Sequence, residues 1–290
     1  MSSTASPLAA PEPWDLVAPE YVRELLPVFE NFARDALSRM AVGPGSRVVD
    51  VAAGPGTLSL LAARQGARVT AVDFAPQMLS ALRERATAEG LDIEALAGDG
   101  MALPLPDQTF DTAFSLFGLM FFPDRPRGFR ELHRVLVPGG RAIVSSWLPL
   151  EHSPAMNTVY QSFAELMTGG GGGGGAPRDG MMPLSDRETC LREMASAGFD
   201  EVAVYETTAR AEYPSTAAMV DSMIRASAPV VLARKALGEK WPSIQQALLE
   251  KVSTVLGPGP QVGLFNAYLT TGIRHPSAAS KNRHPTANKR

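Results

Sequence analysis

The chain contains the run Val48-Val49-Asp50-Val51-Ala52-Ala53-Gly54-Pro55-Gly56-Thr57, in which an apolar strand leads into a glycine turn and then into a helix. A second predicted strand, residues 68–72, ends at Asp73. Glycines have no Cβ and let the backbone approach a ligand closely, and the first turn of a helix favours an anionic group. Asp73 is placed to accept hydrogen bonds from the two hydroxyls of a ribose. These features predict a nucleoside-containing cofactor at the carboxyl ends of parallel strands.

The glycine turn does not match a dinucleotide-binding fingerprint. That fingerprint requires a third glycine three residues beyond Gly56, where this chain has Ser59. The sequence also contains no GxxxxGKS or GxxxxGKT run, which argues against a phosphate-binding loop. The pattern therefore favours a cofactor with a ribose, a base and a small anionic group but no phosphate.

From Arg47 to Trp147 the chain resembles the class I S-adenosylmethionine-dependent methyltransferases, especially the group related to the ubiquinone and menaquinone biosynthesis methyltransferases. Residues 50–56 resemble the first motif of that family, although Ala52 stands where many members have a glycine. Residues 97–101 resemble the exit of its third strand, residues 110–118 its fourth strand and the following loop, and residues 134–140 the turn before its fifth strand. All these landmarks occur in the expected order.

The resemblance implies S-adenosylmethionine as the cofactor and assigns roles to individual residues. Asp73 would hold the ribose, Asp99 would accept from the adenine amino group, and Met101 would pack on the adenine face. The full set of implied cofactor-binding residues is Tyr21, Ala52, Gly54, Gly56, Asp73, Phe74, Met78, Asp99, Gly100, Met101 and Ser115.

Several of these residues also have a purely structural interpretation. Gly54 and Gly56 could form an ordinary turn between a strand and a helix. Asp73 could cap the helix that begins at Pro76, and Asp99 could be a turn residue between two glycines. Tyr21 could equally be a core residue. The sequence leaves these alternatives open.

The order of elements predicts the fold class. Seven strands are expected, at residues 48–51, 69–72, 93–97, 110–116, 141–147, 202–205 and 264–273. Helical segments alternate with the first five, which indicates an α/β fold with a doubly wound, Rossmann-like and mostly parallel sheet. The resemblance implies that the last strand is antiparallel.

The domain is expected to span residues 14–274, with amphipathic helices at its start. Segments at about 151–183 and 214–258 are predicted to form an inserted helical lid, because both follow strands at the carboxyl edge of the sheet. The glycine run at 169–175 is predicted to be a flexible linker in that lid. Residues 1–13 and 275–290 are expected to be disordered.

Composition limits the possible functions. The chain has 290 residues, a formal net charge of −3 and one cysteine, Cys190, so no internal disulfide can form. The expected tail at 275–290 carries four basic residues and no acid, which leaves 23 basic against 30 acidic residues in the body. An acidic body is a poor match for nucleic acid. No apolar run is long enough to cross a bilayer, and residues 1–13 do not resemble a secretory signal, so we expect a cytoplasmic protein.

Methyl transfer from a sulfonium mainly requires alignment of the acceptor and exclusion of water. Among the histidines, only His152 follows the fifth strand on the expected substrate side, and it is the candidate base or substrate contact. No metal site is expected, because Ser145 and Ser146 after the fifth strand offer no hard-cation ligand. The apolar loop at 117–122 would favour a hydrophobic or aromatic acceptor if it lines the pocket. It could instead pack beneath the lid.

The leading hypothesis is methyl transfer to oxygen, carbon or nitrogen of a small apolar or aromatic acceptor. The loop at 115–118 lacks the Asn-Pro-Pro-Tyr type run expected for methylation of amino groups on DNA bases. Two rivals are a nicotinamide-dependent oxidoreductase on the same type of sheet and a non-catalytic module that binds S-adenosylmethionine. The sequence predicts neither the acceptor itself nor the oligomeric state.

Overall fold

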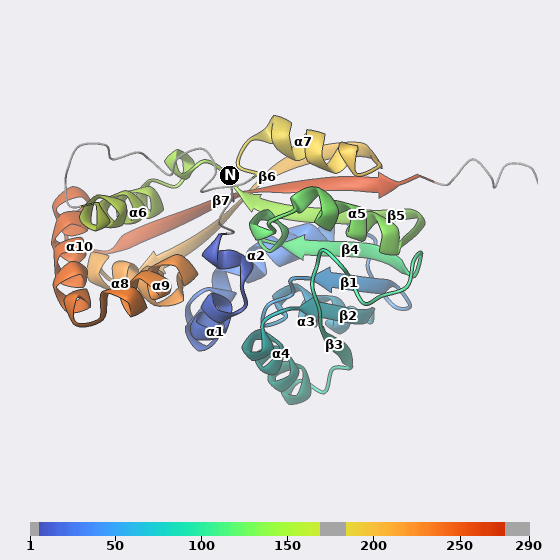
Figure 1. The fold of residues 1–290 in the computed structure, drawn as a ribbon, viewed down its shortest axis with the longest axis horizontal. Helices are drawn as coiled ribbons and strands as arrows, with labels where there is room; N and C mark the ends of the chain where they lie inside the picture. Colours follow the sequence, from blue (N-terminus) through green and yellow to red (C-terminus); the bar gives the residue numbers. More distant parts are fainter. Residues whose placement is uncertain (1–5, 169–183, 276–290) are drawn as a thin grey trace, which may run out of the picture.

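The computed structural model describes residues 6–168 and 184–275, and it contains a mixed seven-stranded sheet covered by helices (Figure 1). The strand order is β3-β2-β1-β4-β5-β7-β6. Strands β1 to β5 pair in parallel, whereas β7 is antiparallel to both β5 and β6. The strands are β1 (Arg47–Val51), β2 (Arg68–Asp73), β3 (Ile93–Ala97), β4 (Phe110–Leu116), β5 (Leu136–Trp147), β6 (Phe199–Tyr213) and β7 (Gln261–Arg274). The predicted fold class, including the antiparallel last strand, is confirmed.

Helices cover both faces of the sheet, which is why the central strands are almost uniformly apolar. On one face, α2 and α3 pack over a core that contains Val48, Leu58 and Phe114. On the other face, α5 and α7 pack over a core that contains Val49, Leu132 and Met194. The helices are α1 (Glu12–Glu24), α2 (Leu26–Ser38), α3 (Thr57–Arg64), α4 (Pro76–Ala88), α5 (Arg125–Val135), α6 (Pro154–Met167), α7 (Arg187–Ser196), α8 (Thr216–Ala226), α9 (Ala228–Leu237) and α10 (Trp241–Leu256).

Strand β1 lies between β2 and β4, so the connections that leave it diverge to opposite sides. In open α/β sheets this divergence creates a crevice at the carboxyl ends of the strands. The crevice is therefore expected where β1 ends at Val51 and β4 ends at Leu116. Both glycine-containing loops singled out in the sequence, after β1 and after β3, open toward it.

Strand β6 (Phe199–Tyr213) is much longer than the predicted 202–205, whereas β7 (Gln261–Arg274) extends only a few residues beyond the predicted 264–273. Their paired register runs from Phe199 with Arg274 to Tyr213 with Gln261, so the two strands project past the rest of the sheet. Helices α6, α8, α9 and α10 pack around the projecting ends, as Figure 1 shows. The prediction stopped short because the outer part of β6 alternates polar residues such as Thr208 and Arg210, which suit an exposed edge strand.

Three further predictions concern the chain ends and the linker. Residues 1–13 were expected to be disordered, but residues 6–13 contain a short 3-10 helix, η1 (Pro7–Ala9), and the start of α1. The linker at 169–175 and residues 276–290 of the tail lie outside the described residues. Within residues 6–168 and 184–275, no single helix has the length and apolarity to cross a membrane, although α8 with the segment 228–256 passes that test as a pair bent by 85°.

Candidate functional site

The turn between β1 and α3 is built from left-handed backbone conformations. Ala52, Gly54 and Gly56 have φ values of +55°, +55° and +78°. A Cβ built on Gly56 would lie 2.6 Å from Cγ of Leu82, so this glycine is required by the backbone and by packing against α4. A Cβ built on Gly54 would meet no heavy atom of the described residues within 4 Å. Gly54 is thus the position where the backbone is open to a ligand.

Asp73, at the end of β2, ties the two neighbouring strand ends together. Its Oδ2 accepts from the backbone N–H of Gly54 at 2.7 Å, and its Oδ1 accepts from Ala75 N–H at 2.8 Å. The side chain is nearly buried, with 5% of its surface exposed. Burial raises the pKa of Asp73 to about 6, although the backbone N–H donors partly oppose that shift.

A second buried carboxyl, Asp50, lies below the same turn. Ser59 Oγ donates to Asp50 Oδ2 at 2.7 Å, and burial raises the pKa of Asp50 to about 7. Asp50 does not line the cavity described below. Ser59 stands where a dinucleotide fingerprint would require glycine, so here that position serves to anchor α3 to β1. No separate role for Asp50 was apparent from the sequence.

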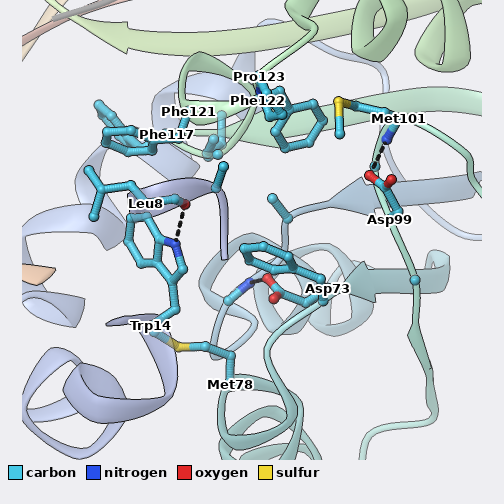
Figure 2. A pocket seen from close by; sticks show the side chains of 18 of the residues that line it. Leu8, Trp14, Asp73, Met78, Asp99, Met101, Phe117, Phe121, Phe122 and Pro123 are labelled. Atoms are coloured by element: carbon cyan, nitrogen blue, oxygen red, sulfur yellow. Dashed lines mark hydrogen bonds between the residues drawn. The ribbon is translucent and has the colours of Figure 1, made fainter. Parts of the chain in front are cut away.

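A cavity of about 250 Å³ opens at the carboxyl ends of β1, β2, β3 and β4 (Figure 2). It is lined by Leu8, Ala9, Trp14, Tyr21, Ala52, Gly54, Asp73, Phe74, Met78, Gly98, Asp99, Gly100, Met101, Leu116, Phe117, Gly118, Phe121, Phe122 and Pro123. Nine of the eleven predicted cofactor-binding residues are in this set, and the two outside it are Gly56 and Ser115. Residues distant in sequence are therefore brought to one crevice.

Gly56 and Ser115 lie outside the cavity lining and stabilise the loops that form it. Ser115 is completely buried, and its Oγ accepts from Leu119 N–H at 3.1 Å. This bond fixes the start of η2 (Leu119–Phe121), which follows β4. Ser115 therefore lies outside the cavity lining and supports the loop after β4, and its contact with the cofactor stays a prediction.

Asp99 forms the turn that the sequence allowed and also lies in the cavity lining, where its predicted contact with adenine stays a prediction. Its Oδ1 accepts from Met101 N–H at 2.8 Å, which is a turn-forming bond, and its side chain also lines the cavity. Beside it, a Cβ built on Gly100 would lie 2.3 Å from the ring of Phe122. Glycine at this position lets the ring close over the loop after β3.

The opposite end of the cavity is aromatic. Figure 2 shows Asp99 and Met101 at one end and Leu8, Trp14 and Phe117 at the other. Trp14 Nε1 donates to the carbonyl of Leu8 at 2.9 Å, and its ring centroid lies 5.2 Å from that of Phe121. The sequence analysis raised the loop at 117–122 as a possible lining, and Phe117, Gly118, Phe121 and Phe122 do line the cavity. It did not identify Leu8, Ala9 or Trp14.

Phe117 occupies an unusual backbone conformation for an aromatic residue, with φ at +57°. Its N–H donates to Ser145 Oγ at 2.8 Å, and its ring lies 4.2 Å from that of Trp147 and 4.8 Å from that of Phe29. The strained residue is thus held by one buried hydrogen bond and by three aromatic neighbours, of which the third is Phe32 with its ring centroid 5.1 Å away. Phe117 connects the cavity wall to the core beneath β5.

Tyr21 on α1 lines the cavity and also packs on Phe29, with ring centroids 5.4 Å apart. Burial, with a smaller contribution from the nearby Asp73 carboxylate, raises the pKa of the Tyr21 phenol. The hydroxyl therefore stays protonated at neutral pH and can donate a hydrogen bond, but it is not suited to act as a base.

The N-terminal segment is fastened over the cavity from both sides. Gln77 N–H, in the first turn of α4, donates to Asp15 Oδ1 at 2.8 Å, and Lys235 Nζ on α9 donates to Glu12 Oε1 at 2.5 Å. No described residue of the two predicted lid segments lines the cavity. Helices α8 and α9 instead pack against α1. The lid prediction thus needs correction for the described residues, because α8 and α9 support α1 rather than cover the cavity, and α6 and α10 pack on each other.

The candidate base, His152, does not lie in the cavity lining. It is exposed at the end of η3 (Leu150–His152), where its carbonyl oxygen accepts from Asn266 Nδ2 at 2.5 Å. Cys190 is buried on α7 and its thiol donates to the carbonyl of Leu184, as a structural residue would. Among the described residues no group of three or more His, Cys, Asp or Glu side chains is arranged to hold a metal ion.

The charges of the cavity lining suit an adenosyl sulfonium compound. The lining contains two carboxylates, at Asp73 and Asp99, and none of its described residues is basic. This charge pattern fits a cationic group, and the unobstructed backbone at Gly54 leaves room for close approach. A pyrophosphate would meet two carboxylates here.

Comparisons with known proteins agree with this chemistry. Residues 49–144 match the family model described as a methyltransferase domain. Demethylmenaquinone methyltransferase of Corynebacterium kroppenstedtii is 35% identical over 173 residues, which cover 57% of this chain and 72% of that protein. An uncharacterized protein of Mycobacterium tuberculosis is 37% identical over 132 residues, and the matched region spans about half of its length, 46%. Among solved structures, the [4+2]-cyclase SpnF superposes with a TM-score of 0.58 at 18% identity and covers 94% of this chain and 100% of its own.

The chain belongs to the class I S-adenosylmethionine-dependent methyltransferases, in the group related to the menaquinone methyltransferases. S-adenosylmethionine is the cofactor of this family, and the cavity residues described above are compatible with it.

Proposed function

We propose that this protein transfers the methyl group of S-adenosylmethionine to a small, apolar, aromatic acceptor of the hydroquinone class. The observation that carries the proposal is that one cavity is lined both by two carboxylates, Asp73 and Asp99, which we call its polar end, and by the aromatic side chains Trp14, Phe117 and Phe121, which we call its aromatic end. The relative in Corynebacterium kroppenstedtii acts on demethylmenaquinone according to its name, which supports a quinone-derived acceptor.

The polar end binds the nucleoside. Asp73 accepts hydrogen bonds from the ribose hydroxyls, and Asp99 accepts from the adenine amino group. The Gly54 N–H already donates to Asp73, so that bond orients the carboxylate before any ligand arrives. Met101 and Phe74 supply apolar surface for the base.

The aromatic end binds the acceptor and excludes water. When bound, the cofactor would supply a methyl group on a sulfonium, an electrophile that needs no further activation. The methyl–sulfur bond breaks as the bond to the acceptor forms, S-adenosylhomocysteine leaves, and the proton that the acceptor loses passes to solvent. Trp14, Phe117 and Phe121 hold a planar acceptor against the cofactor, and the segment that contains Leu8 and Trp14 closes the site from solvent. Because His152 lies outside the lining, its predicted role as a base forms no part of this proposal.

Location and partners follow the same reasoning. A single buried cysteine fits a reducing compartment, and we propose a cytoplasmic location for the protein. The acidic body argues for a small-molecule partner rather than nucleic acid.

One alternative function is supported by a specific observation: the protein could bind S-adenosylmethionine without transferring its methyl group. The [4+2]-cyclase SpnF has the same fold, so the fold alone does not decide whether methyl transfer takes place. A protein that binds the cofactor without using its methyl group would share the polar end of this cavity.

The test uses the purified full chain. Calorimetry should detect binding of S-adenosylmethionine and S-adenosylhomocysteine, and incubation with methyl-labelled cofactor and 1,4-naphthohydroquinone should give a labelled product. The product structure distinguishes transfer to ring carbon from transfer to oxygen. Absence of cofactor binding would end the proposal, and binding without transfer to this or related hydroquinones would favour the non-methylating rival.

A further inference from the structure

Two residues from different loops contact each other closely in the wall of the cavity. Ala52 follows β1 and Gly118 follows β4, and both line the cavity. A Cβ built on Gly118 would lie only 2.3 Å from the Cβ of Ala52. The next nearest atoms, Ala52 O and Ser115 Oγ, would lie at 3.4 Å, which is ordinary van der Waals contact. The contact therefore has room for one methyl group and not for two.

The backbone at these two positions favours the opposite arrangement of residues. Ala52 has φ at +55°, where a Cβ is strained and glycine is not. Gly118 has φ at −101° and ψ at −57°, close to the ordinary right-handed region, which an alanine can adopt. Placing glycine at 52 and alanine at 118 would relieve the strain without adding a methyl group. In this chain the single methyl group of the contact nevertheless belongs to Ala52, the residue with the strained backbone.

We infer that Ala52 and Gly118 are a positioning pair, in which the methyl group of Ala52 presses the loop after β4 against the cofactor turn and thereby sets the position of both. The pair connects the polar end of the cavity, through Gly54, to the aromatic end, through Phe117. Phe117 is adjacent to Gly118 and is itself held at positive φ by Ser145. Strain at Ala52 and Phe117 is thus concentrated where the two loops touch.

This inference rests on the proposed function, because its main measurement is cofactor affinity. The affinity for S-adenosylhomocysteine and the thermal midpoint should be measured for four variants of the full chain. These are Ala52→Gly, Gly118→Ala, the double variant with both changes, and Gly43→Ala. Gly43 is the matched control, since a Cβ there would meet no heavy atom of the described residues within 4 Å.

We expect Gly118→Ala to weaken S-adenosylhomocysteine binding by about tenfold and to lower the thermal midpoint. Ala52→Gly should keep or raise the midpoint but weaken binding by about threefold, because the loops lose their contact. The double variant should return the affinity to within about twofold of the natural chain. The Gly43 variant should behave as the natural chain does.

Three results would overturn the inference: natural affinity in Gly118→Ala, natural affinity in Ala52→Gly, or a double variant as weak as Gly118→Ala. Natural-chain protein that fails to bind S-adenosylhomocysteine would instead refute the proposed function. In that case the thermal midpoints still test the contact between residues 52 and 118. If that contact has room for only one methyl group, Gly118→Ala should lower the thermal midpoint and the double variant should restore it.

Discussion

The two ends of the cavity are constructed in different ways. The polar end comes from three strand exits that lie close together in the chain, between Ala52 and Met101, and backbone hydrogen bonds to Asp73 and Asp99 fix its geometry. The aromatic end combines Leu8 and Trp14 with Phe117 and Phe121, which are more than 100 residues away. Side-chain packing joins its two parts, with the ring centroids of Trp14 and Phe121 5.2 Å apart, whereas the hydrogen bond from Trp14 to Leu8 lies within the N-terminal part.

This difference assigns separate tasks to the two ends. Backbone hydrogen bonds within one sheet edge give a rigid site that is formed before its ligand binds. The N-terminal part of the aromatic end is instead held by side-chain packing of α1 against α4, α8 and α9 and by hydrogen bonds from Gln77 N–H to Asp15 and from Lys235 to Glu12. We therefore expect the polar end to determine cofactor affinity and the aromatic end to determine acceptor use. The following predictions test that separation.

The largest effect is expected at the polar end. Asp73→Ala should weaken S-adenosylhomocysteine binding by more than tenfold, a loss of at least about 1.4 kcal/mol, because the ribose hydroxyls lose their acceptor. Calorimetry measures this directly. Phe121→Ala is the matched control from the other end and should keep the affinity within about twofold. Equal losses in the two variants would contradict the separation of tasks.

A smaller effect is expected at the aromatic end. Trp14→Ala should lower kcat/KM for 1,4-naphthohydroquinone by about five- to tenfold, mostly through KM, because the acceptor loses a planar contact. Affinity for S-adenosylhomocysteine should change little. Leu16→Ala, on an exposed position of the same helix, controls for effects on α1. A Trp14 variant that loses cofactor affinity instead would place the nucleoside at the aromatic end.

The smallest effect concerns pH. Because burial raises the pKa of Asp73 to about 6, protonation should weaken S-adenosylhomocysteine binding about fourfold between pH 7.5 and pH 5.5. Asp73→Asn should flatten this dependence. An unchanged pH profile in Asp73→Asn would show that another group, such as Asp50, is responsible.

The same carboxyl should affect stability in the opposite direction. Its pKa in the folded protein lies above the ordinary value of 3.8, so the folded state binds the proton more strongly than the unfolded chain does. This contribution to stability is complete below about pH 4 and is lost as the pH rises through about 6. Cofactor affinity and the stability contribution of Asp73 should therefore change oppositely across this range.

The sequence predicted the polar end well and the aromatic end poorly, for physical reasons. Strand, turn and helix around Gly54 are set by local patterns, and parallel strands bring their ends together without further information. Trp14 and Leu8 reach the cavity only because α1 packs against α4, α8 and α9, and no local pattern encodes that packing. The helix at α1 could be predicted, and Tyr21 on it was expected at the site and does line the cavity, but Trp14 on the same helix was not identified.

Gly56 and Ser115, the two predicted residues outside the lining, show the same dependence on packing between elements. Gly56 was read as a point of ligand approach, whereas its freedom is needed for a positive φ and for contact with Leu82. Ser115 was placed at the cofactor because it follows the motif order, but its hydroxyl is used by Leu119 N–H behind the cavity. For both residues the motif predicted a position near the site, but the atoms that each residue contacts are set by neighbours from other elements.

The most direct measurement is a crystal structure of the full chain with S-adenosylhomocysteine. Our account predicts the ribose hydroxyls within hydrogen-bond distance of Asp73, the adenine beside Asp99 and Met101, and the sulfur directed toward Phe117 and Trp14. An adenosyl group bound in the reverse direction, or in a different crevice, would contradict it.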